Sequence, residues 1–384
     1  MKMKKLKVMT VLGTRPEIIR LASVMNLLDQ FTNHVLVHTG QNYDFELNQV
    51  FFDELGVREP DLFLNVDTSS LGKVLGEILI KTEEVILIEK PDALLVLGDT
   101  NSAIALMMAK RMKIPTYHME AGNRSFDANV PEEINRKLVD HLADFNLVYT
   151  EHARRHLISE GLSHRFVYVT GSPMLEVLNS KKSKIEASNV LSELKLDKHG
   201  YFIVSVHREE NVDSRENLEK VVECLKLIYD QYQKPVIVST HPRTRKRLEA
   251  IDADFEQRDI RFLKPFGFFD YNKLQKDCYC AISDSGTISE ESAMLDFPAV
   301  TLRNSIERPE ALDAGSILLT GLNPTILLNA IDLAVNELKF VESREIPQEY
   351  TVTNTSIRVV KLIMGTAKLS HKWKNQDEFS RYDW

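Results

Sequence analysis

The chain alternates short apolar runs with longer amphipathic patterns along most of its length, and this alternation limits the possible folds more than any other feature. The first run, Lys7–Val11, is β-branched and ends at Gly13–Glu17, where Pro16 suits the first turn of a helix. Apolar strands that alternate with amphipathic helices predict a parallel sheet covered by helices on both faces. We therefore expect an α/β fold.

Length and pattern together predict two domains. A chain of 384 residues exceeds the usual size of a single core. The polar, lysine-rich stretch 179–189 is the best candidate for a linker, so we expect domains at 1–180 and 181–384. The last helical pattern, 357–369, has no strand after it and is expected to pack back on the first domain. The expected strands are 7–11, 34–39, 93–97, 116–119, 145–149, 166–170, 201–206, 236–240, 261–263, 280–283, 299–302 and 317–319.

Composition excludes several classes of function. The net charge of −8 disfavours a non-specific nucleic-acid binder, and no apolar run approaches the ~18 residues that span a bilayer. Three cysteines cannot form a disulfide framework, which favours a reducing, cytoplasmic location. Neither half contains a Gly-x-Gly-x-x-Gly or P-loop pattern, and His207, His241 and the candidate carboxylates belong to separate expected strands, without an i, i+4 pair on one helix. We therefore expect no NAD, no other cofactor and no metal.

One stretch of the second half, Ile282–Ser292, combines a buried strand, a turn of small residues and a helix. This geometry directs free backbone N–H groups and a helix dipole at an anion such as a phosphate. Glu291, one turn into the helix, is placed to accept hydrogen bonds from sugar hydroxyls. The alternative interpretation is an ordinary N-capped helix with Ser285 or Thr287 as the cap.

Polar residues that directly follow buried strands are the other candidates, because open parallel sheets bind ligands beyond the carboxyl ends of their strands. In the first half three carboxylates stand out, at Asp99, Glu120 and Glu132, and they would suit acid/base chemistry. Asp99 and Glu132 could equally be helix caps or dipole partners. In the second half, His207 and His241 follow strands and would extend a diphosphate cradle. Two such edges would form one cleft between the domains, with acids on one wall and anion binders on the other.

These motifs resemble a known family, the non-hydrolysing UDP-N-acetylglucosamine 2-epimerases. The matching blocks, in chain order, are Gly13–Glu17, Gly98–Thr100, His118–Gly122, Pro131–Arg136, Thr170–Ser172, His207–Arg208, Ser283–Gly286, Glu290–Glu291 and Glu307–Glu310. The resemblance covers most of the chain. It implies the glycosyltransferase-B architecture of two Rossmann-like domains, a UDP-sugar substrate, a homodimer, and C2 inversion without NAD or metal.

The family's chemistry, as the resemblance implies it, is elimination of UDP to a 2-acetamidoglycal followed by its re-addition. Positions that match the family's motifs then receive roles. The implied catalytic residues are Asp99, Glu120, Glu132 and His207. The implied UDP-sugar contacts are Arg15, Arg136, His241, Ser285, Gly286, Thr287, Glu291 and Arg308.

The sequence departs from the commonest family pattern at several places. Arg20 stands where a lysine is common, Glu209 replaces an arginine, and Thr287 replaces a glycine; the block linked to allosteric activation reads Gln41–Asp44. These features resemble a branch that serves capsule and O-antigen synthesis. We therefore expect as substrate the UDP-linked 6-deoxy-L-talosamine derivative that gives UDP-N-acetyl-L-fucosamine, or UDP-N-acetylglucosamine.

Other functions remain open at this stage. They are a UDP-2,3-diacetamido-uronate 2-epimerase, a glycosyltransferase of the same architecture, a hydrolysing epimerase, and a catalytically silent UDP-sugar sensor.

Overall fold

The computed structural model describes residues 5–40, 45–127, 130–240, 244, 247–248, 255 and 258–373, with the backbone alone for 45–48 and 209–210. The chain divides into two compact units, one formed by Met1–Ser180 with Val352–Trp384 and the other by Lys181–Thr351. The polypeptide therefore returns to the first unit after Thr351, whereas the sequence boundary placed all residues after 180 in the second domain.

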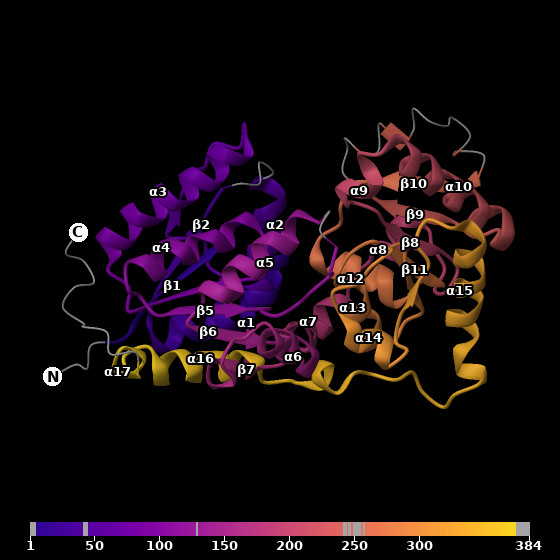
Figure 1. Ribbon diagram of the computed structural model, residues 1–384. Helices are drawn as coiled ribbons and strands as arrows, with labels where there is room; N and C mark the ends of the chain where they lie inside the picture. Colours follow the sequence, from indigo (N-terminus) through magenta and orange to yellow (C-terminus); the bar gives the residue numbers. More distant parts are fainter. Residues whose placement is uncertain are drawn as a thin grey trace. The chain divides into compact units, whose positions relative to one another are not determined.

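The first unit is built on a parallel sheet with strand order β3-β2-β1-β4-β5-β6-β7 (Figure 1). Its strands are β1 (Lys7–Leu12), β2 (Asn33–His38), β3 (Leu62–Phe63), β4 (Ala93–Leu97), β5 (Thr116–Met119), β6 (Phe145–Val148) and β7 (Val167–Val169). The central strands are buried along almost their whole length, as strands covered on both faces must be.

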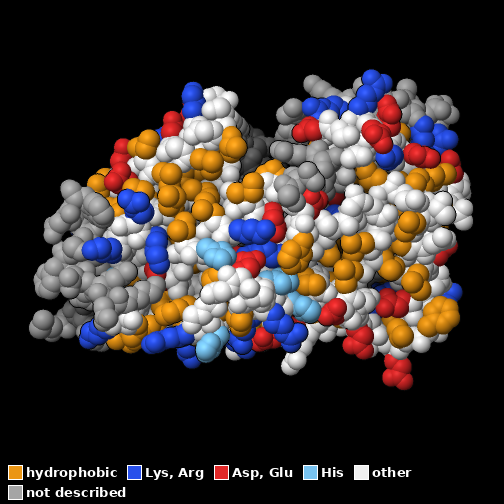
Figure 2. Space-filling view, in the orientation of Figure 1, with side chains coloured by type: hydrophobic (Ala, Val, Ile, Leu, Met, Phe, Trp, Pro, Cys, Tyr) orange, Lys and Arg blue, Asp and Glu red, His pale blue; other side chains and the backbone are white. Residues whose placement is uncertain are grey.

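Helices cover both faces of this sheet. They are α1 (Arg15–Phe31), α2 (Phe45–Leu55), α3 (Leu71–Glu89), α4 (Ala105–Arg111), α5 (Pro131–Leu142), α6 (Glu151–Ser159) and α7 (Met174–Glu186), with short 3₁₀ turns η1 (Asn101–Ile104) and η2 (His164–Phe166). Met9 and Val11 of β1 pack with α3 and α4 in one apolar cluster. Hydrophobic side chains also lie on the outer surface over α3, where Ile80 and Ile88 are exposed (Figure 2).

The C-terminal helices α16 (Thr355–Thr366) and α17 (Ser370–Trp373) belong to the first unit, and α16 packs against α1 (Figure 1). The Tyr117 hydroxyl lies 2.7 Å from Thr366 Oγ1, and Thr355 Oγ1 donates to the Thr170 carbonyl at 3.1 Å. The expectation that the last helix packs back on the first domain is confirmed.

The second unit repeats the architecture with strand order β10-β9-β8-β11-β12-β13. Its strands are β8 (Phe202–Ser205), β9 (Val236–Ser239), β10 (Ile260–Leu263), β11 (Cys280–Ser283), β12 (Ala299–Thr301) and β13 (Leu318–Leu319). Its helical elements include α8 (Val190–Leu194), α9 (Glu209–Val212), α10 (Arg215–Tyr232), α12 (Phe268–Lys276), α13 (Ile288–Leu295), α14 (Pro309–Asp313), α15 (Pro324–Asn336), η4 (Glu337–Lys339) and η5 (Gln348–Thr351).

Both sheets have the strand order of Rossmann folds, so the expected α/β fold with two Rossmann-like domains is confirmed. The 179–189 stretch is not an irregular linker, because α7 runs through the boundary at Ser180. Lysine is a good helix former, so a polar, lysine-rich run does not by itself end a helix. The two-residue strand β3 was not predicted, since it is too short to show a period of two. Among the described residues, no helix is long and apolar enough to cross a membrane.

Candidate functional site

The candidate residues gather where strand order reverses in each sheet. In the first unit the reversal lies between the paired strands β1 and β4, and in the second between β8 and β11. Connections leave such a pair in opposite directions and open a crevice at the carboxyl ends of the strands. Arg15 follows β1, Asp99 follows β4, His207 follows β8 and Ser285 follows β11. These four sequence-predicted residues therefore lie at the two places where this fold binds ligands.

Helix α5 holds Asp99 through its side chain and its backbone. Arg136 Nη2 lies 2.5 Å from Asp99 Oδ2, and Asn135 Nδ2 donates to the Asp99 carbonyl at 2.9 Å. The Arg136 guanidinium also donates to Glu133 at 3.1 Å and is almost fully buried. Arg136 therefore orients Asp99, a contact that the predicted role in substrate binding did not include.

Glu120 follows β5, next to β4, in a constrained backbone conformation. Its φ of +62° lies in the left-handed region, which a non-glycine residue adopts at a cost. Its carboxylate forms an ion pair with Arg20 of α1 and accepts from Asn123 Nδ2 at 3.4 Å. Thus Arg20, noted in the sequence only as a departure from the family pattern, contacts one of the predicted acids.

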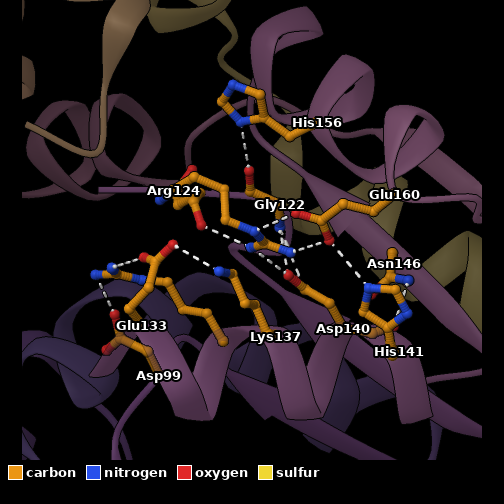
Figure 3. A network of polar contacts seen from close by, with 12 residues as sticks. Asp99, Gly122, Arg124, Glu133, Lys137, Asp140, His141, Asn146, His156 and Glu160 are labelled. Atoms are coloured by element: carbon orange, nitrogen blue, oxygen red, sulfur yellow. Dashed lines mark hydrogen bonds and ion pairs between the residues drawn. The ribbon is translucent and has the colours of Figure 1, made fainter. Parts of the chain in front are cut away.

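A buried polar network anchors the loop that begins with Glu120 (Figure 3). Arg124 is fully buried and donates to Asp140 of α5 at 2.7 Å and to both carboxylate oxygens of Glu160, which directly follows α6, at 2.7 Å. The Gly122 N–H donates to Asp140, and His156 Nδ1 lies 3.0 Å from the Gly122 carbonyl. Because each buried charge has a partner, the loop has a defined path that sets the direction of Glu120.

The network extends to the neighbouring strand and to the surface. His118 of β5 lies with Nδ1 2.9 Å from Asp140 and Nε2 2.7 Å from the Gly98 carbonyl, directly before Asp99. Burial raises the pKa of Glu160, but hydrogen bonds from Arg124 and His141 outweigh it and lower this pKa to about 2. His118 and Arg124 thus link the loops that carry Asp99 and Glu120.

The third predicted acid, Glu132, is exposed at the start of α5. Its neighbour Glu133 is buried instead and accepts from the Ser125 N–H and hydroxyl, both at 3.0 Å. Arg15 is partly buried at the start of α1, with its guanidinium carbon 5.9 Å from the centre of the Phe51 ring. The structure therefore brings Arg15, Asp99 and Glu120 to adjacent strand ends and leaves Glu132 on the surface of the unit.

Glu17, to which the sequence motif assigned no role, has a raised carboxyl pKa. Its side chain is buried at the start of α1, and this burial raises its pKa to about 7 despite hydrogen bonds from Ser102, Thr14 and Gly13.

In the second unit, Asp284 organises the strand ends. This fully buried residue follows β11, and its carboxylate accepts from the backbone N–H of His207 at 3.1 Å and of Arg208 at 3.0 Å. Asn211 Nδ2 donates to it at 3.0 Å, and His207 Nδ1 lies 3.1 Å away. The His207 side chain is 57% exposed, so Asp284 orients the ring while leaving part of it open to solvent.

The turn after Asp284 is held by Arg308. Arg308 Nε donates to the Gly286 carbonyl at 3.0 Å, and its Nη2 lies 3.1 Å from buried Glu290. The Ser285 and Thr287 hydroxyls lie 3.0 Å apart at the start of α13. Arg308 is almost fully buried, so it fixes the backbone of the predicted phosphate turn from within the unit.

Other predicted residues of the second unit have less direct support. Glu291 accepts from Gln275 Nε2 at 2.6 Å and is partly buried. His241 lies outside the described residues.

Sequence reasoning gave no role to Asp140, Arg124 or Glu17, because the contacts that define them join distant parts of the chain. The signal available for Asp284 was its place between a buried strand and a small-residue turn.

Comparison with known proteins agrees with this geometry. The family model described as UDP-N-acetylglucosamine 2-epimerase matches residues 28–364. The structure of a UDP-N-acetylglucosamine 2-epimerase from Rickettsia bellii is 43% identical and superposes with a TM-score of 0.88 over 96% of this chain and 98% of that one. The Methanocaldococcus jannaschii enzyme, solved in complex with UDP-GlcNAc and UDP, is 34% identical with a TM-score of 0.87 over 94% of this chain and 100% of that one.

A third relative has a different substrate in its name. The UDP-2,3-diacetamido-2,3-dideoxy-D-glucuronate 2-epimerase of Pseudomonas aeruginosa is 33% identical over 82% of this chain and 88% of its own. Matches of this extent establish that the chain belongs to the non-hydrolysing UDP-N-acetylglucosamine 2-epimerase family, isomerases that invert C2 of UDP-linked sugars.

Proposed function

We propose that this enzyme interconverts UDP-N-acetylglucosamine and UDP-N-acetylmannosamine by eliminating UDP and adding it back. The C2–H bond has no adjacent carbonyl, so direct removal of this proton is unfavourable. Breaking the bond between C1 and the UDP oxygen builds positive charge at C1 and acidifies C2–H. Loss of the C2 proton then gives a 2-acetamidoglycal and UDP. Re-formation of the C1–O bond, with a proton delivered to the opposite face of C2, gives the epimer.

The first unit would supply the groups that exchange the proton. The observation that carries the proposal is the pair of carboxylates at adjacent strand ends, Asp99 oriented by Arg136 and Glu120 paired with Arg20. A positioned carboxylate can remove a proton in one direction of the reaction and return it in the other. Glu132 is proposed as a further acid/base group, and its exposed position leaves it accessible to solvent and ligand.

The second unit would hold UDP through both half-reactions. The Asp284 contacts hold His207, which is proposed to contact the diphosphate, and the turn of Ser285, Gly286 and Thr287 precedes the N-terminus of α13. Backbone N–H groups at such a turn suit phosphate oxygens. Glu291 is proposed to accept from the ribose hydroxyls, and Arg15 and His241 to complete the UDP contacts. If UDP stays bound, the second half-reaction does not require UDP to bind again from solution, with the loss of entropy that this would involve.

The substrate is assigned from the relatives. UDP-GlcNAc in the name of the Rickettsia protein and in the complex of the Methanocaldococcus enzyme supports this sugar over the 6-deoxy sugar expected from the sequence. The Pseudomonas relative supports UDP-2,3-diacetamido-uronate as a second candidate. A role in surface polysaccharide synthesis and a homodimer remain predictions. Light scattering would test the dimer, because it would give twice the chain mass of 44.0 kDa.

Incubation of the enzyme in deuterium oxide with a panel of UDP-sugars tests the proposal. The panel contains UDP-GlcNAc, the 6-deoxy sugar and the diacetamido-uronate. The expected result is deuterium at C2 of the epimer, with UDP still attached, and fastest turnover with UDP-GlcNAc. Free sugar would indicate hydrolysis. Transfer to an added acceptor with the original C2 hydrogen would indicate a glycosyltransferase, and binding without exchange would indicate a sensor.

A further inference from the structure

Glu17 makes an unusual set of contacts at the start of α1. Its Oε2 accepts from the Gly13 N–H at 3.1 Å and from the Thr14 hydroxyl at 2.8 Å. In an ordinary capping box, the cap hydroxyl binds a helix N–H and the acid three residues later binds the cap N–H. Here the Thr14 side chain does not cap a helix N–H and donates to the acid instead. Glu17 therefore holds Gly13 and Thr14, the two residues that directly precede Arg15 in the turn between β1 and α1.

The other oxygen of Glu17 reaches a different loop. Oε1 accepts from the hydroxyl of Ser102, which lies 85 positions further along the chain in η1, after β4. The Ser102 hydroxyl in turn lies 2.6 Å from Thr100 Oγ1. One carboxylate thus joins the loops that follow β1 and β4, the two strands between which the sheet reverses its order.

Helix capping alone does not account for this arrangement. Glu17 is 1% exposed and Ser102 is fully buried, whereas a capping glutamate can remain in water. Burial of a carboxylate is unfavourable unless hydrogen bonds compensate the loss of its hydration. Gly13 and Thr14 donate from one loop and Ser102 from the other, so the full set of these hydrogen bonds exists only when both loops adopt their observed positions.

We infer that Glu17 is a positioning residue, which ties the Arg15 turn to the loop that carries Asp99 and so sets the place of the Asp99 carboxylate. The inference rests on the proposed function, in which Asp99 exchanges the C2 proton. Displacement of a reacting group by about 1 Å can cost on the order of 100-fold in rate. Loss of the link is therefore expected to lower turnover while leaving the UDP contacts of the second unit in place.

The chain allows a matched set of variants. Ser102→Ala removes the link between the loops and keeps the contacts of Glu17 with Gly13 and Thr14. Glu17→Gln is the conservative variant, because its Oε1 can accept from Gly13 and Thr14 while its Nε2 donates to Ser102 Oγ. Ser370→Ala is the control, since Ser370 is also a buried serine of the first unit but belongs to α17.

Steady-state kinetics with UDP-GlcNAc, UDP titration by calorimetry and thermal unfolding are measured for each variant. We expect Ser102→Ala to lower kcat about tenfold or more, with KM and UDP affinity within about twofold of wild type. Glu17→Gln should have a kcat close to that of wild type, and Ser370→Ala should have the wild-type kcat. Thermal unfolding shows whether a lower kcat arises only because a smaller fraction of the variant is folded.

The outcomes separate this inference from the function on which it rests. If Asp99→Asn abolishes turnover but Ser102→Ala has wild-type kcat, the positioning role is wrong and the proposed function stands. If Ser102→Ala lowers kcat only in proportion to its folded fraction, the link is structural and the inference also fails. If Asp99→Asn itself turns over at the wild-type rate, Asp99 does not exchange the proton and the positioning role fails with it, whereas the proposed function is wrong only if the wild-type enzyme does not epimerise UDP-GlcNAc.

Discussion

The buried carboxyl of Glu17 should make the stability of the enzyme depend on pH near neutrality. Its pKa is about 7 in the folded protein and 4.5 in an ordinary environment, because burial disfavours the charged form. Between these values the folded chain binds a proton that the unfolded chain has released, so folding is favoured at the lower pH. The contribution of Glu17 is fully present below about pH 4.5 and is lost as the pH rises through about 7.

The size of the effect follows from the difference between the two pKa values. At 1.36 kcal/mol for each pH unit, the interval from 4.5 to about 7 corresponds to about 3 kcal/mol of unfolding free energy. Glu17→Gln cannot ionise and should lack this dependence. Burial raises the pKa of Glu310 as well, but that residue is unchanged in the variant and cancels in the comparison.

Urea unfolding of wild type and Glu17→Gln at pH 5 and pH 8.5 measures the effect. Because pH 5 already lies above the ordinary pKa of 4.5, the variant should gain stability relative to wild type by about 2.5 kcal/mol between the lower and the higher pH. The transition must be followed by a probe in the first unit, such as the stacked pair of Tyr117 and Phe145, because the two units can unfold separately. Parallel pH curves for the two proteins would refute the reasoning, since they would mean that Glu17 titrates alike in both states.

Three further substitutions test the site itself. Asp99→Asn should keep UDP affinity but slow turnover by on the order of 100-fold or more, measured by steady-state kinetics, and an unchanged rate would remove Asp99 from the mechanism. Ser285→Ala should mainly weaken UDP binding in calorimetry, and full affinity would contradict the phosphate turn. Asp284→Asn should weaken UDP binding about tenfold or more, because an amide N–H then faces the donors of His207 and Arg208. Wild-type affinity with a folded protein would show that these donors do not need the carboxylate.

The sequence predicted the fold and the edges of the sheets that carry the candidate residues. The spacing of apolar residues is a local property of the sequence. Strands such as β1 and β11 could therefore be assigned without knowledge of the strands beside them. The strand-end rule then selected Asp99, Glu120, His207 and Ser285, and the observed strand order places them beside the two reversals.

The predicted boundary at 180/181 coincides with the division between the two units, but the sequence was less informative about the local structure there and about neighbouring acids. A lysine-rich run was interpreted as a linker, but it forms part of α7, because its polarity reflects exposure and not a break in the helix. At the start of α5, the sequence motif singled out Glu132 and gave its neighbour Glu133 no role. Only the direction of each side chain on the helix distinguishes the exposed Glu132 from the buried Glu133.

The alternation of apolar runs and the family motifs, read along the chain, were thus enough to determine an α/β fold, a parallel arrangement of strands and a UDP-sugar epimerase. The tertiary structure alone decided which charges meet. Arg20 and Glu120 are 100 positions apart, Glu17 and Ser102 are 85 apart, and His207 and Asp284 are 77 apart. Such contacts depend on how the sheet orders its strands and on which buried charge finds a partner, and neither leaves a periodic signal in the sequence.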